Sequence, residues 1–378
     1  MEQPGLRDEG DPSATARAHA RTADPLADAV AAAFAALPAG QGRNMLEAAL
    51  TRGVGAVQGA PPSLREFFDH ADRPPLWLDR DRIERGGALF LRSGLLGVCV
   101  LSLACLPMMY RLPAGNKPLV ITGQLLRRAP RRLAETARFV LQTSVPGGLR
   151  RDGAGFASTL RVRLMHAQVR RLLLRNGRWD AEWGVPVNQL HMAATGVTLS
   201  VVFLDGLRRL GLRVGRDEAD ALMALWRYSG HLMGVVPELQ CSTEMEGHHL
   251  MRCLDAYEGG PDSDSRALME AVMTASYLPE LDRHAWRVPL AYDLSRRFVG
   301  DALADGLGYP PPRYWRWLFP ALRPPLAALN VWQRAMPGAG ERASRRGAAQ
   351  VEAIIGRMFS GSQVAAAAGM SVGTGSTP

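Results

Sequence analysis

The sequence predicts an all-α fold, and three observations lead to this prediction. Apolar residues recur at helical spacing in several segments, with arginines and other polar residues between them, and few segments alternate as strands do. Clusters of glycine and proline, such as Pro146-Gly147-Gly148, separate these segments. Hydrophobic residues make up 47% of the 378 residues and charged residues 21%, which is typical of a globular protein with a sizeable core.

The first four predicted helices lie in the N-terminal half. Residues 28–37 are rich in alanine, the strongest helix former. Residues 79–96 begin with charges and then become apolar. Residues 122–142 and 159–175 carry leucine, valine or phenylalanine at three- and four-residue spacing with arginines between them, which is the pattern of an amphipathic helix.

The other predicted helices follow in the C-terminal half. Residues 188–210 are mainly apolar and start at Asn188, a good helix N-cap. Residues 216–235 open with three acids, which the positive end of a helix dipole favours. Residues 263–275 and 292–307 complete the set.

These helices are expected to form one domain. No Pro/Ser linker and no repeat of 20–50 residues divides residues 25–359. The polar residues 1–24 and the small, charge-free residues 360–378 are expected to be disordered. The N-terminus lacks the basic start and apolar stretch of a secretory signal, so we expect a cytoplasmic protein.

One apolar segment, residues 93–110, is a candidate transmembrane helix by its length. Between Arg92 and Arg111 there are 18 residues without a charge, which is the lower limit for a transmembrane helix. Pro107 is expected to break this helix near its end. The sequence therefore favours a buried core helix over a membrane span, and it leaves open a peripheral contact of residues 93–110 with a membrane.

Charge and cysteine content exclude several classes of function. Arginine and lysine total 45 against 36 acids, a net charge of +9, and Lys117 is the only lysine. Such arginine bias is typical of high-GC codon usage, so we expect no nucleic-acid partner. The four cysteines form no CxxC pair, and no phosphate-binding glycine loop or HExxH motif occurs. Zinc-ribbon proteins, nucleotide-dependent enzymes and common metalloproteases are thereby disfavoured.

The strongest candidate motif lies in residues 159–175. Arg163, His166 and Arg170 are spaced i, i+3 and i+7, which places them on one face of a helix. Neighbouring positive charge and burial both favour a neutral imidazole, the form that ligates iron. The flanking arginines could pair with carboxylates, including the propionates of a haem. The alternative is a core histidine beside two surface arginines.

Two further motifs carry weaker signals. Arg132, Glu135 and Thr136 share a helical face, as either the polar wall of a buried pocket or a solvated ion pair. Glu246 and His249 form a single ExxH motif, whereas di-metal helical bundles require two.

Several segments together resemble the MpaB/latex-clearing-protein oxygenases, whose shared domain was called DUF2236. They occur in the family's order between residues 85 and 330. The segments are RRLAETARFV, RVRLMHAQVRR, GVPVNQLHMAATGVTLSVVF, GLRRLGLRVGRDEADALMALWRYSGHLMGV and DGLGYPPPRYWRWLFPALRPP.

The resemblance implies an all-α fold with a globin-like core that holds b-type haem. It implies that His166 is the axial ligand of the haem iron and that Arg163 and Arg170 support haem binding. On the opposite side of the haem, Arg132 and Thr136 match residues of the rubber-cleaving members.

Two departures from the family pattern affect the expected chemistry. Glu135 stands where rubber-cleaving members have a lysine, and no acid occurs between Arg111 and Ala134, where those members have a catalytic glutamate. Either Glu135 takes over as the base or the chemistry differs.

The expected function is therefore a haem-dependent oxygenase. Its substrates would be O₂ and a hydrophobic molecule, an isoprenoid or another unsaturated lipid, whose C=C bond it cleaves. Two alternatives remain open. One is a non-haem metal enzyme that uses Glu246, His248 and His249, and the other is a catalytically inactive helical lipid-binding protein.

Overall fold

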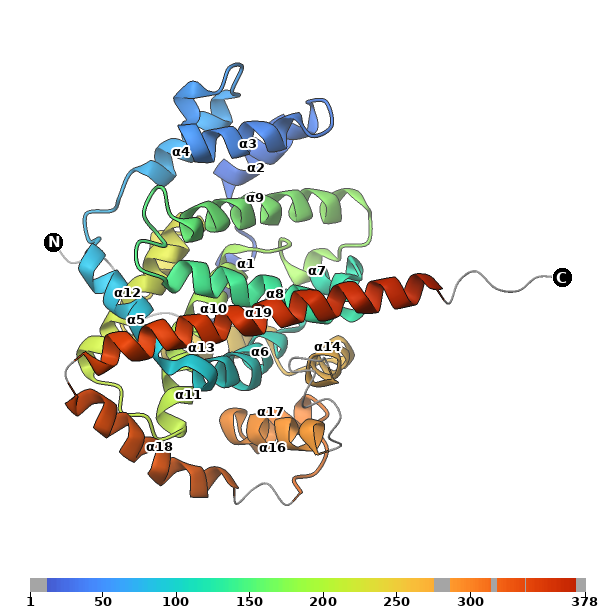
Figure 1. Ribbon diagram of the computed structural model, residues 1–378. Helices are drawn as coiled ribbons and strands as arrows, with labels where there is room; N and C mark the ends of the chain where they lie inside the picture. Colours follow the sequence, from blue (N-terminus) through green and yellow to red (C-terminus); the bar gives the residue numbers. More distant parts are fainter. Residues whose placement is uncertain (1–11, 275–285, 314–317, 337, 372–378) are drawn as a thin grey trace. The chain divides into compact units, whose positions relative to one another are not determined.

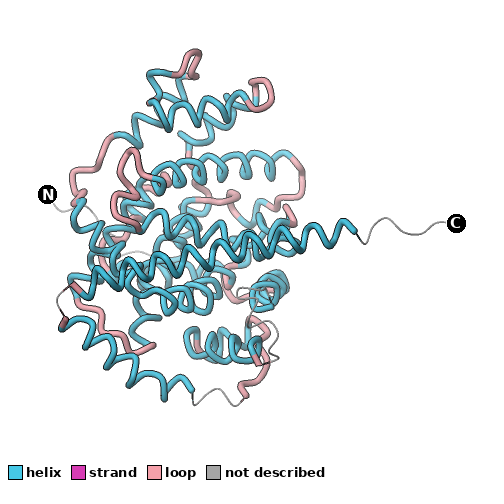
Figure 2. The backbone as a smooth tube through the Cα atoms, in the orientation of Figure 1, coloured by secondary structure: helices cyan, strands magenta, loops and turns pink. Residues whose placement is uncertain are grey.

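The computed structural model describes residues 12–274, 286–313, 318–336 and 338–371 (Figure 1). Every regular element in these ranges is a helix, as Figure 2 shows by colour. The predicted all-α class is confirmed.

The chain divides into two compact units, and the single domain expected from the sequence stays a prediction. Unit 1 consists of the residues up to Leu89, Gln142–Leu204 and Val214–Gly259, and unit 2 consists of Phe90–Leu141, Asp205–Arg213 and the residues from Gly260 onward. Three of the boundaries fall inside continuous helices, α5, α8 and α11, whose bounds are given below. No linker composition marks such a boundary, and this explains why the sequence did not reveal it.

Unit 1 contains most of the N-terminal helices and the predicted histidine helix. Its helices are α1 (Pro12–Ala20), α2 (Pro25–Ala35), α3 (Gln41–Arg52), α4 (Pro62–Asp72), the first part of α5 (Arg80–Val100), α9 (Ala154–Arg175), α10 (Gln189–Val197), α12 (Arg216–Leu232) and α13 (Glu244–Glu258).

The N-terminal segment corrects our expectation of disorder through residue 24. Residues 1–11 lie outside the described residues, but α1 follows them and buries the small side chains of Ala16 and Ala20. The backbone carbonyl of Ala20 accepts a hydrogen bond from the amide of Val185 at 2.8 Å. Asp24 then caps α2 by accepting a hydrogen bond from the amide of Ala27. The amino-acid composition could not predict this helix, because its buried side chains are small alanines that pack against residues distant in the sequence.

Unit 2 contains the remaining helices. They are α6 (Leu106–Tyr110), α7 (Pro113–Ile121), most of α8 (Gln124–Ser144), most of α11 (Phe203–Arg209), α14 (Ser263–Thr274), α16 (Arg287–Val299), α17 (Asp301–Gly306), α18 (Leu318–Ala335) and α19 (Ala339–Ser371).

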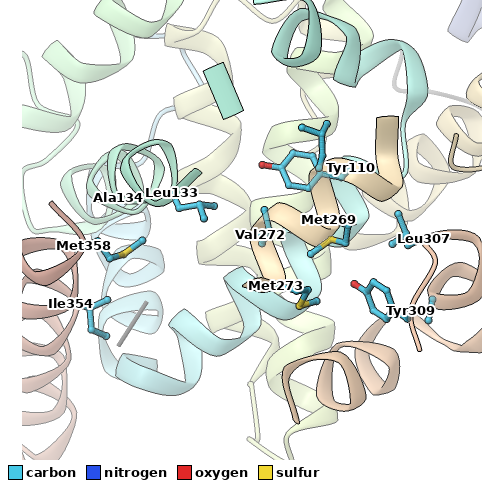
Figure 3. Close-up of a cluster of buried hydrophobic side chains, with 12 residues drawn as sticks. Tyr110, Leu133, Ala134, Met269, Val272, Met273, Leu307, Tyr309, Ile354 and Met358 are labelled. Atoms are coloured by element: carbon cyan, nitrogen blue, oxygen red, sulfur yellow. The ribbon is translucent and has the colours of Figure 1, made fainter. Parts of the chain in front are cut away.

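The core of unit 2 joins α8, α14 and α19. Figure 3 shows Leu133 of α8 and Met358 of α19 among these buried side chains, with Val272 of α14 nearby. On another side of α19, Gly347 meets α5 so closely that a Cβ atom there would collide with the carbonyl of Leu91. This approach coincides with a kink of α5 at Gly94, where φ is +50°.

Several boundaries differ from the predicted ones. The predicted helix 292–307 is divided at Gly300, whose φ of +87° separates α16 from α17. Helix α19 extends to Ser371, so residues 360–371 are helical rather than disordered, and residues 372–378 lie outside the described residues.

The apolar segment stays helical past Pro107. A π-helical stretch, Leu101–Cys105, leads into α6, which ends at Tyr110, so Pro107 does not break the helix as predicted. The change of register in a π-helical stretch accommodates a residue that lacks an N–H.

Among the residues that the structure describes, two helical stretches are long and apolar enough to cross a membrane, judged by length and composition only. These stretches are Arg80–Tyr110 and Gln189–Arg209. In Gln189–Arg209, 78% of the most apolar 18-residue segment is buried, as is usual for a core helix. In Arg80–Tyr110, 50% of the corresponding 18-residue segment is buried.

Candidate functional site

Helix α9 holds three of the predicted site residues on one face. It begins after Gly153 and ends before Gly177, whose φ is +67°. Leu160, Leu164 and Leu173 are buried along it, together with both flanking arginines, and His166 is half-buried. Helix α2 lies beside α9, as Figure 1 shows. Arg163 and Arg170 are each only 2% exposed. The alternative interpretation, a core histidine beside two surface arginines, is therefore wrong about the arginines.

Arg163 has a full set of partners inside unit 1. Its Nε and Nη2 donate to the two carboxylate oxygens of Asp24 at 2.6 and 2.9 Å. Its Nη1 lies 3.2 Å from His70 Nδ1 and 3.3 Å from the carbonyl oxygen of Leu232. The guanidinium also lies over the Phe67 ring, 4.8 Å from its centroid. Arg163 is thus engaged within the protein, and its hydrogen-bonding capacity is directed away from an added carboxylate.

The Arg163 contact determines which ring nitrogen of His70 is unprotonated. An arginine can only donate, so His70 Nδ1 must be the unprotonated ring nitrogen. Burial, then the charges of Arg163 and His231, lower the pKa of His70 to about 4. Burial first, and then the charges of Arg163 and Arg227, lower the pKa of His231. The two imidazoles stack with ring centroids 4.8 Å apart.

These histidines predict how stability depends on pH. The unfolded imidazole of His70 binds a proton near its ordinary pKa of 6.5, and the folded one binds it near 4. Between these values the unfolded state holds more protons, so stability should be lost as the pH falls from about 6.5 to about 4. Urea unfolding across this interval should show a shallower loss in His70→Phe than in the wild type. An equal slope in both proteins would contradict the low pKa of His70.

Arg170 differs sharply from Arg163. Within the described part of the chain, its Nε, Nη1 and Nη2 are buried and have no hydrogen-bond partner. Asp28 Oδ1 lies 3.5 Å from Nη1, which makes an ion pair too long for a hydrogen bond. Burial lowers the pKa of Arg170, and burial raises the pKa of Asp28. This buried cation, one helical turn from His166, therefore has donors that could bind an anionic group.

The second predicted group lies on α8 in unit 2. Glu135 is half-buried, and its carboxylate accepts a hydrogen bond from Arg131 Nε at 3.1 Å, which is an i, i+4 ion pair. Thr136 is exposed. The side chain of Arg132 lies outside the described side chains. Unit 1 thus brings His166, Arg163 and Arg170 together, and α8 carries the other three residues.

The structure gives Glu246 a local role instead of a metal site. Its carboxylate accepts hydrogen bonds from the amide and hydroxyl of Ser242 and from the amide of Thr243, which completes a capping box at the start of α13. His248 is exposed. Among the described residues, no group of three His, Cys, Asp or Glu side chains is placed to hold a metal ion. The geometry therefore disfavours the non-haem alternative.

Sequence reasoning missed Asp24, Asp28 and His70, which surround the α9 arginines. Asp24 precedes Pro25, and an aspartate before a proline is a common helix start. That signal was available for the cap of α2. Nothing in the spacing indicated that the cap would also bind Arg163, which lies 139 positions further along the chain.

The fold and α9 together define an all-helical protein with a half-buried histidine between two buried arginines. A family model confirms the resemblance found in the sequence. The chain belongs to the family described as ER-bound oxygenase mpaB/B'/rubber oxygenase, whose catalytic-domain model matches residues 88–328.

A curated relative and a solved structure are similar to this chain. The rubber oxygenase of Streptomyces sp. (strain K30) is 26% identical over 256 residues, which are 66% of this chain and 61% of that protein. The chain therefore spans about three fifths of the length of this relative. The structure of latex clearing protein LCP in the closed state is 23% identical, with a TM-score of 0.65, and covers 90% of this chain and 91% of that one. This likeness indicates a shared fold.

Proposed function

We propose that this chain is a haem-dependent oxygenase that cleaves a C=C bond of a hydrophobic, unsaturated substrate with O₂. Membership of the oxygenase family supports the reaction class. The observation that most directly supports a haem cofactor is the buried guanidinium of Arg170, which lies one turn from His166 on α9 and has no hydrogen-bond partner among the described residues. Burying a charge without hydrogen bonds costs folding free energy, and a bound anionic group would offset that cost at this site.

The residues of α9 fit a haem. His166 would hold the haem iron, because its imidazole lies half-buried on α9 between two buried arginines and a ring nitrogen of histidine is a common metal ligand. Arg170 is the proposed partner of a propionate, since its guanidinium can form a two-pronged contact with a carboxylate. Arg163 is occupied by Asp24, so we assign it the support of α9 rather than direct contact with the cofactor. When bound, haem supplies the oxygen chemistry that protein side chains lack.

The residues of α8 are the proposed reactive groups of the protein. Arg132 and Thr136 would donate hydrogen bonds toward the reacting oxygen. Glu135 is the proposed acceptor of an allylic proton from the substrate, at the carboxylate that now pairs with Arg131.

Glu135→Gln tests this assignment. The amide has the same shape but cannot accept the proton, so we expect turnover to fall by about 10²–10⁴-fold while haem content stays unchanged. Initial rates with haem-loaded protein measure the effect. Glu84→Gln is the matched control, because Glu84 also pairs with an arginine, Arg150, at 2.8 Å. Equal rates in Glu135→Gln and the control would exclude Glu135 as the base.

Product analysis tests the reaction itself. The haem-loaded protein would be incubated with a low-molecular-mass isoprenoid and isotopically labelled O₂. Cleavage of one C=C bond by one O₂ gives two carbonyl groups, so each product should carry one labelled oxygen atom. Unchanged isoprenoid, with the substrate retained on the protein, would instead support the lipid-binding alternative.

A further inference from the structure

Three segments of unit 1 that are distant in sequence converge on the Arg163 guanidinium. Asp24 comes from the start of α2, His70 from α4 and the Leu232 carbonyl from the end of α12. Asp24 is 3% exposed and Arg163 is 2% exposed, so the ion pair is shielded from water. Two charges buried in this way are stable only when their hydrogen bonds are satisfied, which makes the contact geometrically demanding.

The loop after α12 is shaped to fit this ion pair. Gly234 has a φ of +82°, and a Cβ atom there would lie 2.5 Å from Arg163 Nε and 2.6 Å from Asp24 Oδ2. Only glycine accommodates both the backbone angle and the close approach. The pair is therefore enclosed by backbone as well as by side chains, and the Arg163 side chain is held in one place.

A fixed Arg163 constrains the whole helix that carries it. Arg163 and His166 are spaced i, i+3 on α9, so any rotation or shift of the helix moves both side chains together. A second ion pair reaches α9 from α3, between Arg161 and Glu47, but its side chains are 47% and 41% exposed. Long exposed side chains follow a moving helix, so that pair imposes little constraint.

We propose that Asp24 and His70, acting through Arg163, are positioning residues that set the orientation of α9 and thereby of His166. Both residues lie outside the family-matched range 88–328. The N-terminal segment is thus part of the working site rather than an appendage. The consequence for the cofactor rests on the proposed haem function, whereas the consequence for α9 does not.

The test compares full-length wild type with Asp24→Asn, His70→Phe and Glu47→Gln. Asp24→Asn keeps the size of the side chain and removes its charge, and His70→Phe keeps an aromatic ring to stack on His231 and removes the acceptor. Glu47→Gln is the matched control, because it also removes a carboxylate that pairs with an arginine of α9. Hydrogen exchange of residues 159–175 reports on α9 without haem. The haem absorption spectrum and the haem dissociation rate report on His166.

We expect faster exchange of residues 159–175 in Asp24→Asn than in Glu47→Gln. We also expect haem dissociation to accelerate by about tenfold or more in Asp24→Asn, as for other residues that orient a metal ligand, with an altered spectrum. His70→Phe should show the same changes to a smaller degree. This milder variant decides the matter if Asp24→Asn does not fold.

Two results would overturn the proposal. In one, the folded variants match Glu47→Gln in both exchange and haem properties. In the other, exchange rises evenly along the chain while the haem spectrum and dissociation rate stay at wild-type values, which would make the pair structural only. If the wild type binds no haem, the proposed function fails, and exchange of residues 159–175 alone then decides whether Asp24 and His70 position α9.

Discussion

Arg163→Met should lower the free energy of unfolding by about 3–5 kcal/mol, the range measured when one partner of a buried ion pair is removed. The change leaves the Asp24 carboxylate, 3% exposed, without its countercharge. It also removes the donor to His70 and to the Leu232 carbonyl. Urea unfolding of the haem-free protein, followed by circular dichroism, measures the loss.

Arg161→Met is the control for this prediction. Arg161 lies on the same helix and binds Glu47 in an exposed pair, which typically contributes about 0–1 kcal/mol. A similar small loss in Arg163→Met would mean that the Asp24 contact does not anchor α9.

Arg170→Met, in contrast to Arg163→Met, should not lower the free energy of unfolding. Its guanidinium is buried and has no hydrogen bond within the part of the chain that the structure describes. Its ion-pair partner Asp28 has a side chain that is 34% exposed and can be hydrated when the arginine is removed. Methionine fills similar space without the cost of burying a charge, so the free energy of unfolding should stay the same or rise by about 1 kcal/mol.

Haem affinity should fall in the same Arg170→Met protein. A charged hydrogen bond contributes about 1.5–3 kcal/mol, so loss of the propionate partner should weaken binding by roughly 10–150-fold. Titration of the haem-free protein with haem, followed by absorbance, measures the affinity. Wild-type affinity in Arg170→Met would remove Arg170 from the cofactor site, and a large loss of stability would show that its charge is satisfied in the folded protein.

Periodicity predicted the long helices well, because their apolar faces repeat along the chain. The predicted range 159–175 lies within α9, and 79–96 overlaps most of α5. Helix α1 escaped prediction because its buried face consists of alanines, whose burial depends on α10 and α13 rather than on hydrophobic strength. The division into two units escaped prediction because its boundaries fall inside α5, α8 and α11.

The candidate site was predictable only within single helices. Spacing placed Arg163, His166 and Arg170 on one face of α9, since helical geometry links residues three and four positions apart. The same spacing treated the two arginines alike. Their difference arises from Asp24, in a segment that composition assigned to disorder, and such tertiary partners leave no local pattern in the sequence.

The most direct test of the central claim is the absorption spectrum of the purified protein, expressed with added haem, before and after reduction and exposure to carbon monoxide. We predict a Soret band that shifts on reduction in the wild type and is lost or altered in His166→Ala. The two proteins should have the same circular dichroism, because His166 is only half-buried. A wild type that takes up no haem, or a His166→Ala protein with the wild-type spectrum and haem content, would contradict the assignment of His166 as the iron ligand.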